Sequence, residues 1–351
     1  MNASKRTWYV VGGIVLLAGL LVLPFLFKNF RVFQFNMVMI YAIAVLGLNI
    51  LTGYNGQISL GHGAFYAIGA YVAAMLMAYG HWPFWLTLPV AAAVCFAFGY
   101  LMGFPALRLG GHYLALATFA LALAVPQLLK YKAIEGWTGG VMGIVLNKPE
   151  PPFELTVLGQ PLSQDRWLYF VILAVLLLMF LIAWRLLRGR VGRALIAIRD
   201  HPIAAAAMGI NLPVFKSITF GVSAAYTGVA GALGAVAVAF VSPDSFTVFL
   251  SITFLVGVVV GGLATIHGAI FGAIFIQFVP HWAEDISKSA PWAIYGVFLI
   301  VLMYVMPTGV AGLLDRVFGA LRRPAAPVNT PAARPAPAVA PPSTHPAGGP
   351  S

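Results

Sequence analysis

The chain consists largely of apolar stretches about twenty residues long that contain almost no charged side chains. A helix needs about 20 such residues to cross roughly 30 Å of hydrocarbon, and lipid offers its backbone groups no other partner. The sequence therefore predicts an all-α polytopic membrane protein with about ten transmembrane helices, some of them broken or short. The predicted spans are 8–27, 32–51, 57–79, 84–103, 112–129, 167–185, 215–240, 247–265, 267–280 and 291–307.

The composition excludes a water-soluble fold. Hydrophobic residues make up 61% of the 351 residues and charged residues only 8%, whereas about 25% of a soluble domain is charged. The single cysteine, Cys95, rules out an intrachain disulfide framework. The first apolar stretch ends without a small-residue cleavage site, which indicates a transmembrane helix rather than a removable leader.

Basic residues are concentrated before the first predicted span, after the sixth and after the last. They are Lys5 and Arg6; Arg185, Arg188, Arg190, Arg193 and Arg199; and Arg316, Arg322 and Arg323. Ten spans place all three clusters on one side, which the positive-inside bias identifies as the cytoplasm. We therefore expect a bacterial inner-membrane protein with both termini in the cytoplasm, although Lys28 and Arg31 fall on the opposite side.

This topology divides the chain into three segments. Residues 1–31 form the N-terminal transmembrane helix and first turn, and residues 32–315 form the main transmembrane domain. That domain includes a periplasmic loop, 130–166, and a cytoplasmic loop, 186–214. Residues 316–351 are rich in proline and alanine and bury too little apolar surface to fold, so we expect a disordered cytoplasmic tail.

The predicted spans lack the chemistry of an enzyme or of a self-powered transporter. They contain no acidic residue, whereas ion-coupled transporters use such residues as relays within the membrane. The seven histidines show no metal-ligand spacing, and the sequence has no Walker A loop for ATP. We therefore expect no catalytic residue, metal or cofactor in this chain, and a partner that supplies the energy.

The densest group of polar residues within the predicted spans lies between Leu51 and Tyr66. If this segment is helical from residue 55, one face carries Asn55, Ser59, His62 and Tyr66. Its glycines favour a broken helix whose backbone groups face a pathway, and the alternative is a hydrogen-bonded patch between helices. The candidate solute-pathway residues are Asn55, Gln57, Ser59, His62, Tyr66 and, on the fifth span, Tyr113.

Glycine pairs four residues apart recur in the spans, at 99 and 103, at 257 and 261, and at 268 and 272. Small residues let helix backbones approach closely in lipid, where no hydrophobic effect drives the helices together. These pairs predict close helix packing within one subunit or, as the alternative, between subunits.

The cytoplasmic segment 189–211 contains a predicted short helix. Asp200 suits the N-cap position, Pro202 the first turn and Gly209 the position after the last turn. Between them lie about two turns with an alanine-rich surface, a shape that fits a groove in a partner protein. The alternative is an ordinary basic loop.

Six segments carry a family resemblance: 53–70, 108–115 (Arg-Leu-Gly-Gly-His-Tyr-Leu-Ala), 138–144 (Thr-Gly-Gly-Val-Met-Gly-Ile), 192–211, 242–246 (Ser-Pro-Asp-Ser-Phe) and 258–263 (Val-Val-Val-Gly-Gly-Leu). In this order and spacing they resemble the branched-chain amino acid ABC permeases, LivM-like family, over residues 34–315. The resemblance implies a permease subunit of an ATP-binding-cassette importer that translocates branched-chain amino acids across the inner membrane. The implied partners are a second related permease subunit, two cytoplasmic ATPases that use ATP, and a periplasmic solute-binding protein, with no nucleic acid.

Segment 200–209 resembles the helix that docks into the ATPase in this family. The candidate coupling residues are Arg199, Asp200, Ala204, Ala205, Met208 and Gly209. The chain departs from the family at Pro202 and Ala206, where members often carry acidic residues, and its tail lies outside the family pattern. Two alternatives stay open: the same architecture importing urea, short amides or other amino acids, and a passive channel for a small neutral solute.

Overall fold

A computed structural model describes residues 18–108, 111–151, 156–157, 160–161, 163–286, 288 and 290–322, and the chain divides into two units, residues 1–314 and 315–351. Residues 18–26 are helical and precede α2 (Asn29–Asn49), the π-helical turn η1 (Ile50–Tyr54), α3 (His62–Ala78), α4 (Phe84–Arg108), α5 (Gly111–Leu129), α6 (Glu135–Thr138), the 3₁₀ turn η2 (Gly140–Met142), β1 (Ile144–Val145), β2 (Thr156–Val157) and β3 (Gln160–Pro161). The second half contains α7 (Gln164–Arg188), α8 (Arg190–Asp200), α9 (Pro202–Ala207), α10 (Leu212–Val238), β4 (Phe240–Val241), the 3₁₀ turn η3 (Pro243–Ser245), α11 (Val248–Gly261), α12 (Gly268–Ile286), α13 (Pro291–Val305) and α14 (Gly309–Arg322).

The predicted membrane helices are present in the structure. Six helical segments of the described chain are long and apolar enough to cross a membrane, and α3 and α5 are shorter apolar helices. Every predicted span from 32–51 onward coincides with one helix, although the span predicted from residue 57 begins only at His62. α11 has 14 residues, which confirms that some helices are short.

Three boundary predictions are wrong in detail. Asn29–Arg31 belong to α2 and not to the first turn, because the break between the first two helices lies at residues 27–28. The predicted cytoplasmic loop 186–214 contains the predicted short helix, α9, and also a second helix that was not predicted, α8. α14 continues to Arg322, so residues 316–322 are helical and not part of a disordered tail; residues 1–17 and 323–351 of the predicted terminal segments lie outside the described residues.

Side-chain caps fix where two long helices begin. Ser163 Oγ accepts a hydrogen bond from the Arg166 amide at the start of α7, with Asp165 in the first turn. Asn211 Oδ1 accepts from the Val214 amide at the start of α10. Each cap satisfies a backbone donor that a helix terminus otherwise leaves open.

α10 is the central helix, and its small residues let α3 and α4 approach its backbone. A Cβ on Gly69 of α3 would lie 2.1 Å from the carbonyl oxygen of Gly228. On α4, a Cβ on Gly99 would lie 2.5 Å from the Cβ of Ala224, and one on Gly103 would lie 2.6 Å from the Cα of Ser217. The glycines of α11 and α12 face each other in the same way: a Cβ on Gly272 would lie 2.0 Å from the Gly257 carbonyl oxygen. The predicted close packing therefore occurs within one chain.

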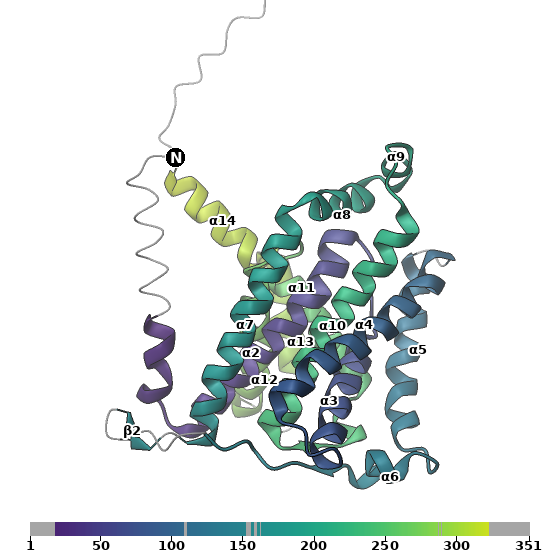
Figure 1. Cartoon of the computed structure of the whole chain (residues 1–351). Helices are drawn as coiled ribbons and strands as arrows, with labels where there is room; N and C mark the ends of the chain where they lie inside the picture. The colour runs from purple at the N-terminus through teal and green to yellow at the C-terminus, as the bar shows by residue number, and fades with distance from the viewer. Residues whose placement is uncertain are drawn as a thin grey trace, which may run out of the picture. The chain divides into compact units, whose positions relative to one another are not determined.

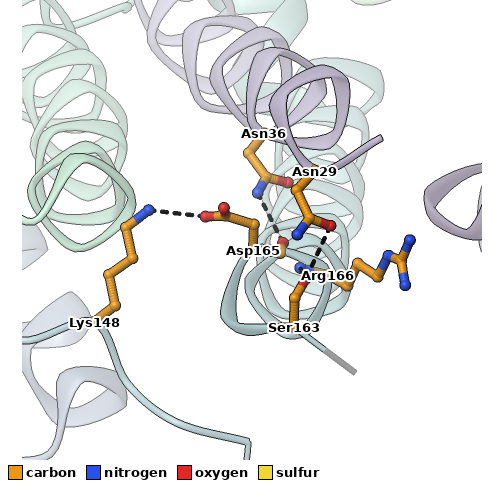
Figure 2. Close-up of polar contacts among 6 residues, drawn as sticks. All are labelled: Asn29, Asn36, Lys148, Ser163, Asp165 and Arg166. Atoms are coloured by element: carbon orange, nitrogen blue, oxygen red, sulfur yellow. Dashed lines mark hydrogen bonds and ion pairs between the residues drawn. The ribbon is translucent and has the colours of Figure 1, made fainter. Parts of the chain in front are cut away.

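Ion pairs and a short strand pair join the connections at the end of the helices opposite α8 and α9 (Figure 1). β1 pairs antiparallel with β4, and Lys130 forms an ion pair with Asp244. Lys148 Nζ lies 2.9 Å from Asp165 Oδ1, and Asn36 Nδ2 donates to the Asp165 carbonyl oxygen at 3.1 Å. Figure 2 shows both contacts. The connection predicted at 130–166 is thus tied to α2 and to the first turn of α7.

The Gly69–Gly228 contact leads to a stability prediction. Gly69→Ala forces α3 away from α10, and we expect the free energy of unfolding in detergent to fall by about 1–3 kcal/mol. Gly296→Ala on α13 is the matched control, because a Cβ there meets no atom within 4 Å. The control should change stability by at most about 1 kcal/mol, in the stabilising direction. Thermal unfolding of both variants measures the difference, and equal midpoints would contradict the packing argument.

Candidate solute pathway and coupling site

The polar run between α2 and α3 is a break in the helix. α2 ends in η1, residues 56–61 have no helical structure, and α3 starts at His62. Gly56 has a φ of +72°, a left-handed conformation that glycine adopts at little cost. The broken helix is therefore confirmed. The prediction of one continuous helical face with Asn55, Ser59, His62 and Tyr66 is wrong, because the turn at Gly56 ends the helical register.

His62 lies at the start of α3 and is fully buried. Its Nε2 lies 2.6 Å from Ser223 Oγ, and its Nδ1 lies 3.0 Å from Ser59 Oγ. Ser223 Oγ donates its one proton to the Gly47 carbonyl oxygen at 2.6 Å, so it accepts from Nε2. Ser59 Oγ accepts from the Gly61 amide at 3.3 Å and donates to Nδ1. A neutral His62 with its proton on Nε2 satisfies this whole network, which favours a structural hydrogen-bonded patch for Ser59 and His62.

Asn49 at the end of α2 is fully buried and holds the connection between α11 and α12. Its Nδ2 donates to the carbonyl oxygens of Thr265, at 2.8 Å, and Gly262, at 3.3 Å. Its Oδ1 accepts from the Ala264 amide at 2.9 Å. One side chain thus satisfies three backbone groups at a helix end, where hydrocarbon offers no partner. Asn49 is not among the residues predicted from the sequence, although a polar side chain inside an apolar span is a signal for such a role.

Three helix breaks meet beside Asn49. A Cβ on Gly53 of η1 would lie 2.4 Å from the Ala264 nitrogen, so η1 packs directly on the α11–α12 connection. Gly309, with a φ of +73°, follows the turn that ends α13, and a Cβ there would lie 2.6 Å from the Gly262 Cα. The end of α2, the connection between α11 and α12 and the turn before α14 thus pack together around Asn49.

The remaining candidates in the break are buried without a full set of partners. Asn55 is 2% exposed and Gln57 is 5% exposed. Gln57 Nε2 donates to the Lys216 carbonyl oxygen at 3.3 Å, but neither Gln57 Oε1 nor the side-chain amide of Asn55 has a partner in the described chain. Tyr113 is 67% exposed on α5 and does not join this group.

A cavity of about 140 Å³ lies between α2, α3, α10 and α11. The side chains that form its aromatic and aliphatic wall include Met37, Tyr41, Tyr66, Val238, Phe246 and Leu250. Tyr66 is the candidate pathway residue that lines it, with its ring centroid 6.0 Å from that of Phe246 and 6.5 Å from that of Tyr41. Gly234 leaves room for Tyr66, because a Cβ there would lie 2.0 Å from the tyrosine oxygen.

The predicted coupling residues lie at the junction of α8 and α9. Asp200 is the last residue of α8, and the N-cap of α9 is His201, so the predicted N-cap role of Asp200 is wrong. Its carboxylate instead accepts from Arg199 Nε at 2.8 Å. This hydrogen bond lowers the pKa of Asp200, so the ion pair is present at neutral pH and is lost as the pH falls through the lowered pKa. Pro202 in the first turn and Gly209 with a φ of +83° after the last turn are confirmed.

α9 presents large apolar side chains at the surface. Ile203 is 85% exposed and Met208 is 84% exposed, and Ala204 is exposed beside them. Ala205 is 4% exposed and faces its own chain. Ile203, which lies in an alanine-rich run, is not among the coupling residues predicted from the sequence. Among the residues that the structure describes, no group of three or more His, Cys, Asp or Glu could hold a metal ion.

Comparison with known proteins decides the family. The family described as "Branched-chain amino acid transport system / permease component" matches residues 31–306. The chain belongs to this family. It is 34% identical over 301 residues to the high-affinity branched-chain amino acid transport system permease protein LivM of Salmonella typhimurium, covering 80% of this chain and 70% of LivM. LivM of Escherichia coli K12 is 33% identical over the same shares, and LivH of that strain is 25% identical over 78% of this chain and 91% of LivH.

No solved structure matches the chain. The family membership and the helices described above make this protein a multi-pass membrane permease, a transport subunit rather than a catalytic enzyme. The breaks around Asn49 and the cavity beside Tyr66 are therefore features of a transport protein.

The His62 network leads to a second stability prediction. Ser223→Ala leaves the buried His62 N–H without an acceptor, at a cost of about 1–3 kcal/mol, whereas the Gly47 carbonyl keeps its hydrogen bond from the Ile50 amide. The matched control, Thr253→Val, removes a hydroxyl whose bond to the Phe249 carbonyl oxygen lies at the surface, and it should change stability by less than about 0.5 kcal/mol. Thermal unfolding of the two purified variants tests this, and an unchanged Ser223→Ala midpoint would show that the network is not stabilising.

Proposed function

We propose that this permease is a LivM-like subunit of an ATP-driven importer that carries branched-chain amino acids across the bacterial inner membrane. The observation that carries the proposal is the match of residues 31–306 to the family of branched-chain amino acid permease components. The relatives named LivM and LivH are both permeases of branched-chain amino acid transport systems. The solute class proposed for this chain is taken from those names.

The proposed partners follow from the same comparisons and from what the chain lacks. Escherichia coli K12 has both a LivM and a LivH relative, which supports a second, related permease subunit. The sequence has no Walker A loop, so two separate cytoplasmic ATPases would bind and hydrolyse ATP. A periplasmic solute-binding protein would deliver the solute to the opposite side.

The positions of the arginines support the proposed orientation of the permease in the membrane. Arg185, Arg188, Arg190 and Arg193 lie at the end of α7 and along α8, and the positive-inside bias assigns this end to the cytoplasm. The opposite end, with its paired charges, would face the periplasm, and both termini would be cytoplasmic.

α9 is the proposed contact with the ATPases. In this orientation α9 lies at the cytoplasmic end (Figure 1). Ile203 in α9 and Met208, which directly follows it, are almost fully exposed. A water-facing turn with two large apolar side chains gains stability when a partner covers it.

The cavity beside Tyr66 favours a branched aliphatic solute over urea or short amides. An apolar cavity of about 150 Å³ holds a benzene molecule, so one of about 140 Å³ has room for a four-carbon side chain. Most of its wall is apolar, including Met37, Val238 and Phe246, so urea would lose most of its hydrogen bonds there. The polar side chains of the lining are Tyr41, Tyr66 and Ser245. We propose that this wall contacts the side chain of the solute during translocation.

Reconstitution tests the proposed class of transporter. The chain is placed in liposomes with its second permease subunit, its ATPases and its binding protein, and leucine uptake is followed with and without ATP. We expect uptake only with ATP and only in the complete complex. Uptake by this chain alone and without ATP would favour the passive channel, and ATP-driven uptake of urea instead of leucine would favour the alternative solute.

A narrower cavity tests the proposed solute contact. Leu250→Phe adds bulk to the wall at a partly exposed position, so the longer side chain of leucine should suffer more than that of valine. One methylene in an apolar pocket is worth about 1–3 kcal/mol, so we expect the ratio of leucine to valine uptake to fall about tenfold. Val297→Phe on the exposed face of α13 is the matched control and should leave the ratio unchanged. An unchanged ratio in Leu250→Phe would exclude the wall as a solute contact.

A further inference from the structure

Arg199 connects the end of α8 to the break in α2. Its Nη1 donates to the Gly53 carbonyl oxygen at 2.9 Å, although the two residues are 146 positions apart in the sequence. Its Nε donates at the same time to Asp200 Oδ1 at 2.8 Å, at the junction with α9. The guanidinium group of Arg199 thus binds both Asp200, where α8 meets α9, and the backbone of η1. The single ammonium group of a lysine could not bind both acceptors in this geometry.

The stem of Arg199 also shapes the turn that follows η1. A Cβ on Gly56 would lie 2.9 Å from Arg199 Cγ and 3.5 Å from its Cα. The left-handed turn at Gly56 therefore passes directly over the arginine stem. Because the two are in direct contact, a displacement of Arg199 must either shift the turn at Gly56 or change its backbone conformation.

The Gly53 carbonyl has a physical need for this partner. It belongs to the last turn of the helical segment that starts with α2, where carbonyl groups lack intrahelical donors and the helix dipole is negative. A cation at this position satisfies the carbonyl and interacts favourably with the dipole. On its other side, Gly53 packs on Asn49 and Ala264, so the same residue contacts the connection between α11 and α12.

The surroundings suggest a second arrangement of this junction. Asn55, two residues beyond Gly53, is buried and has no partner for its side-chain amide within the described residues. Leaving such an amide buried without a hydrogen bond costs about 1–3 kcal/mol. An arrangement of the junction in which water reaches the Asn55 side chain would remove this cost.

We propose that Arg199 is the positioning residue that transmits movement of α9 to the broken junction between α2 and α3. The inference rests on the proposed function, because α9 moves when the ATPases bound to it close. Movement of α9 pulls on Arg199, which shifts the Gly53 carbonyl and the turn at Gly56. The shift then reaches Asn49 and the α11–α12 connection by direct contact.

The first measurement compares transport with ATP hydrolysis in the reconstituted complex. In Arg199→Ala we expect the ATPases to remain bound and to hydrolyse ATP, while the solute carried per ATP falls about tenfold, within the range of allosteric coupling. Arg199→Lys should recover part of the coupling, because lysine can reach one of the two acceptors. Arg193→Ala, which removes the same charge from an exposed site on the same helix, should behave as the wild type.

The second measurement reports the junction itself. Ile58, in the segment between η1 and α3, is 46% exposed, and the native Cys95 is buried, so Ile58→Cys provides a single accessible thiol. Its labelling rate with a water-soluble maleimide should change when the ATPases are trapped with nucleotide. In the Arg199→Ala background this change should disappear, although nucleotide still binds.

Three outcomes overturn the inference. They are normal solute transport per ATP in Arg199→Ala, a nucleotide-dependent change of Ile58→Cys labelling that persists in that variant, and loss of ATPase binding, which would make Arg199 a docking or folding residue. A wild-type complex that transports without ATP would instead reject the proposed function, so the two failures are distinguishable.

Discussion

The structure depends on one constraint: a backbone group within hydrocarbon must find its partner inside the protein. Unbroken helices meet it by themselves, but this permease interrupts its helices at η1, between α11 and α12, and after α13. Asn49 satisfies three of the backbone groups that the second interruption opens, and Arg199 satisfies one at the first. The breaks are possible because these two polar side chains stand beside them.

The constraint also explains why the breaks lie together. An isolated break in lipid would need its own polar side chains, whereas breaks that pack on one another share them. Gly53, Gly262 and Gly309 allow this because each lacks the side chain that would separate the backbones. The result is a region of irregular backbone inside a frame of helices closely packed on α10.

The two ends of the frame are held differently. At the proposed periplasmic end, ion pairs and a strand pair link α2, α7 and the connections between helices. At the proposed cytoplasmic end, the described hydrogen bonds that reach from α8 to η1 come from Arg199. Asn49 and Gln57 add hydrogen bonds from the same end of α2 to the α11–α12 connection and to α10. The residues that line the cavity beside Tyr66 come from α2, α3, α10, α11 and the β4–α11 connection.

The amino-acid sequence by itself determined the membrane helices, their approximate ends and the family. Length and apolarity decide whether a segment can cross lipid, and these properties are local. Gly56 and its neighbouring glycines also indicated a broken helix, since the conformational freedom of glycine is local. The same is true of Pro202 and Gly209 around α9.

Only the tertiary structure decided what each polar side chain does. His62 and Ser59 looked like pathway residues, yet they satisfy each other and Ser223, a residue 161 positions away from His62. Arg199 looked like a member of a surface cluster, yet it binds the Gly53 carbonyl. The sequence shows which groups need partners, but hydrogen bonds between distant segments exist only once the helices have packed.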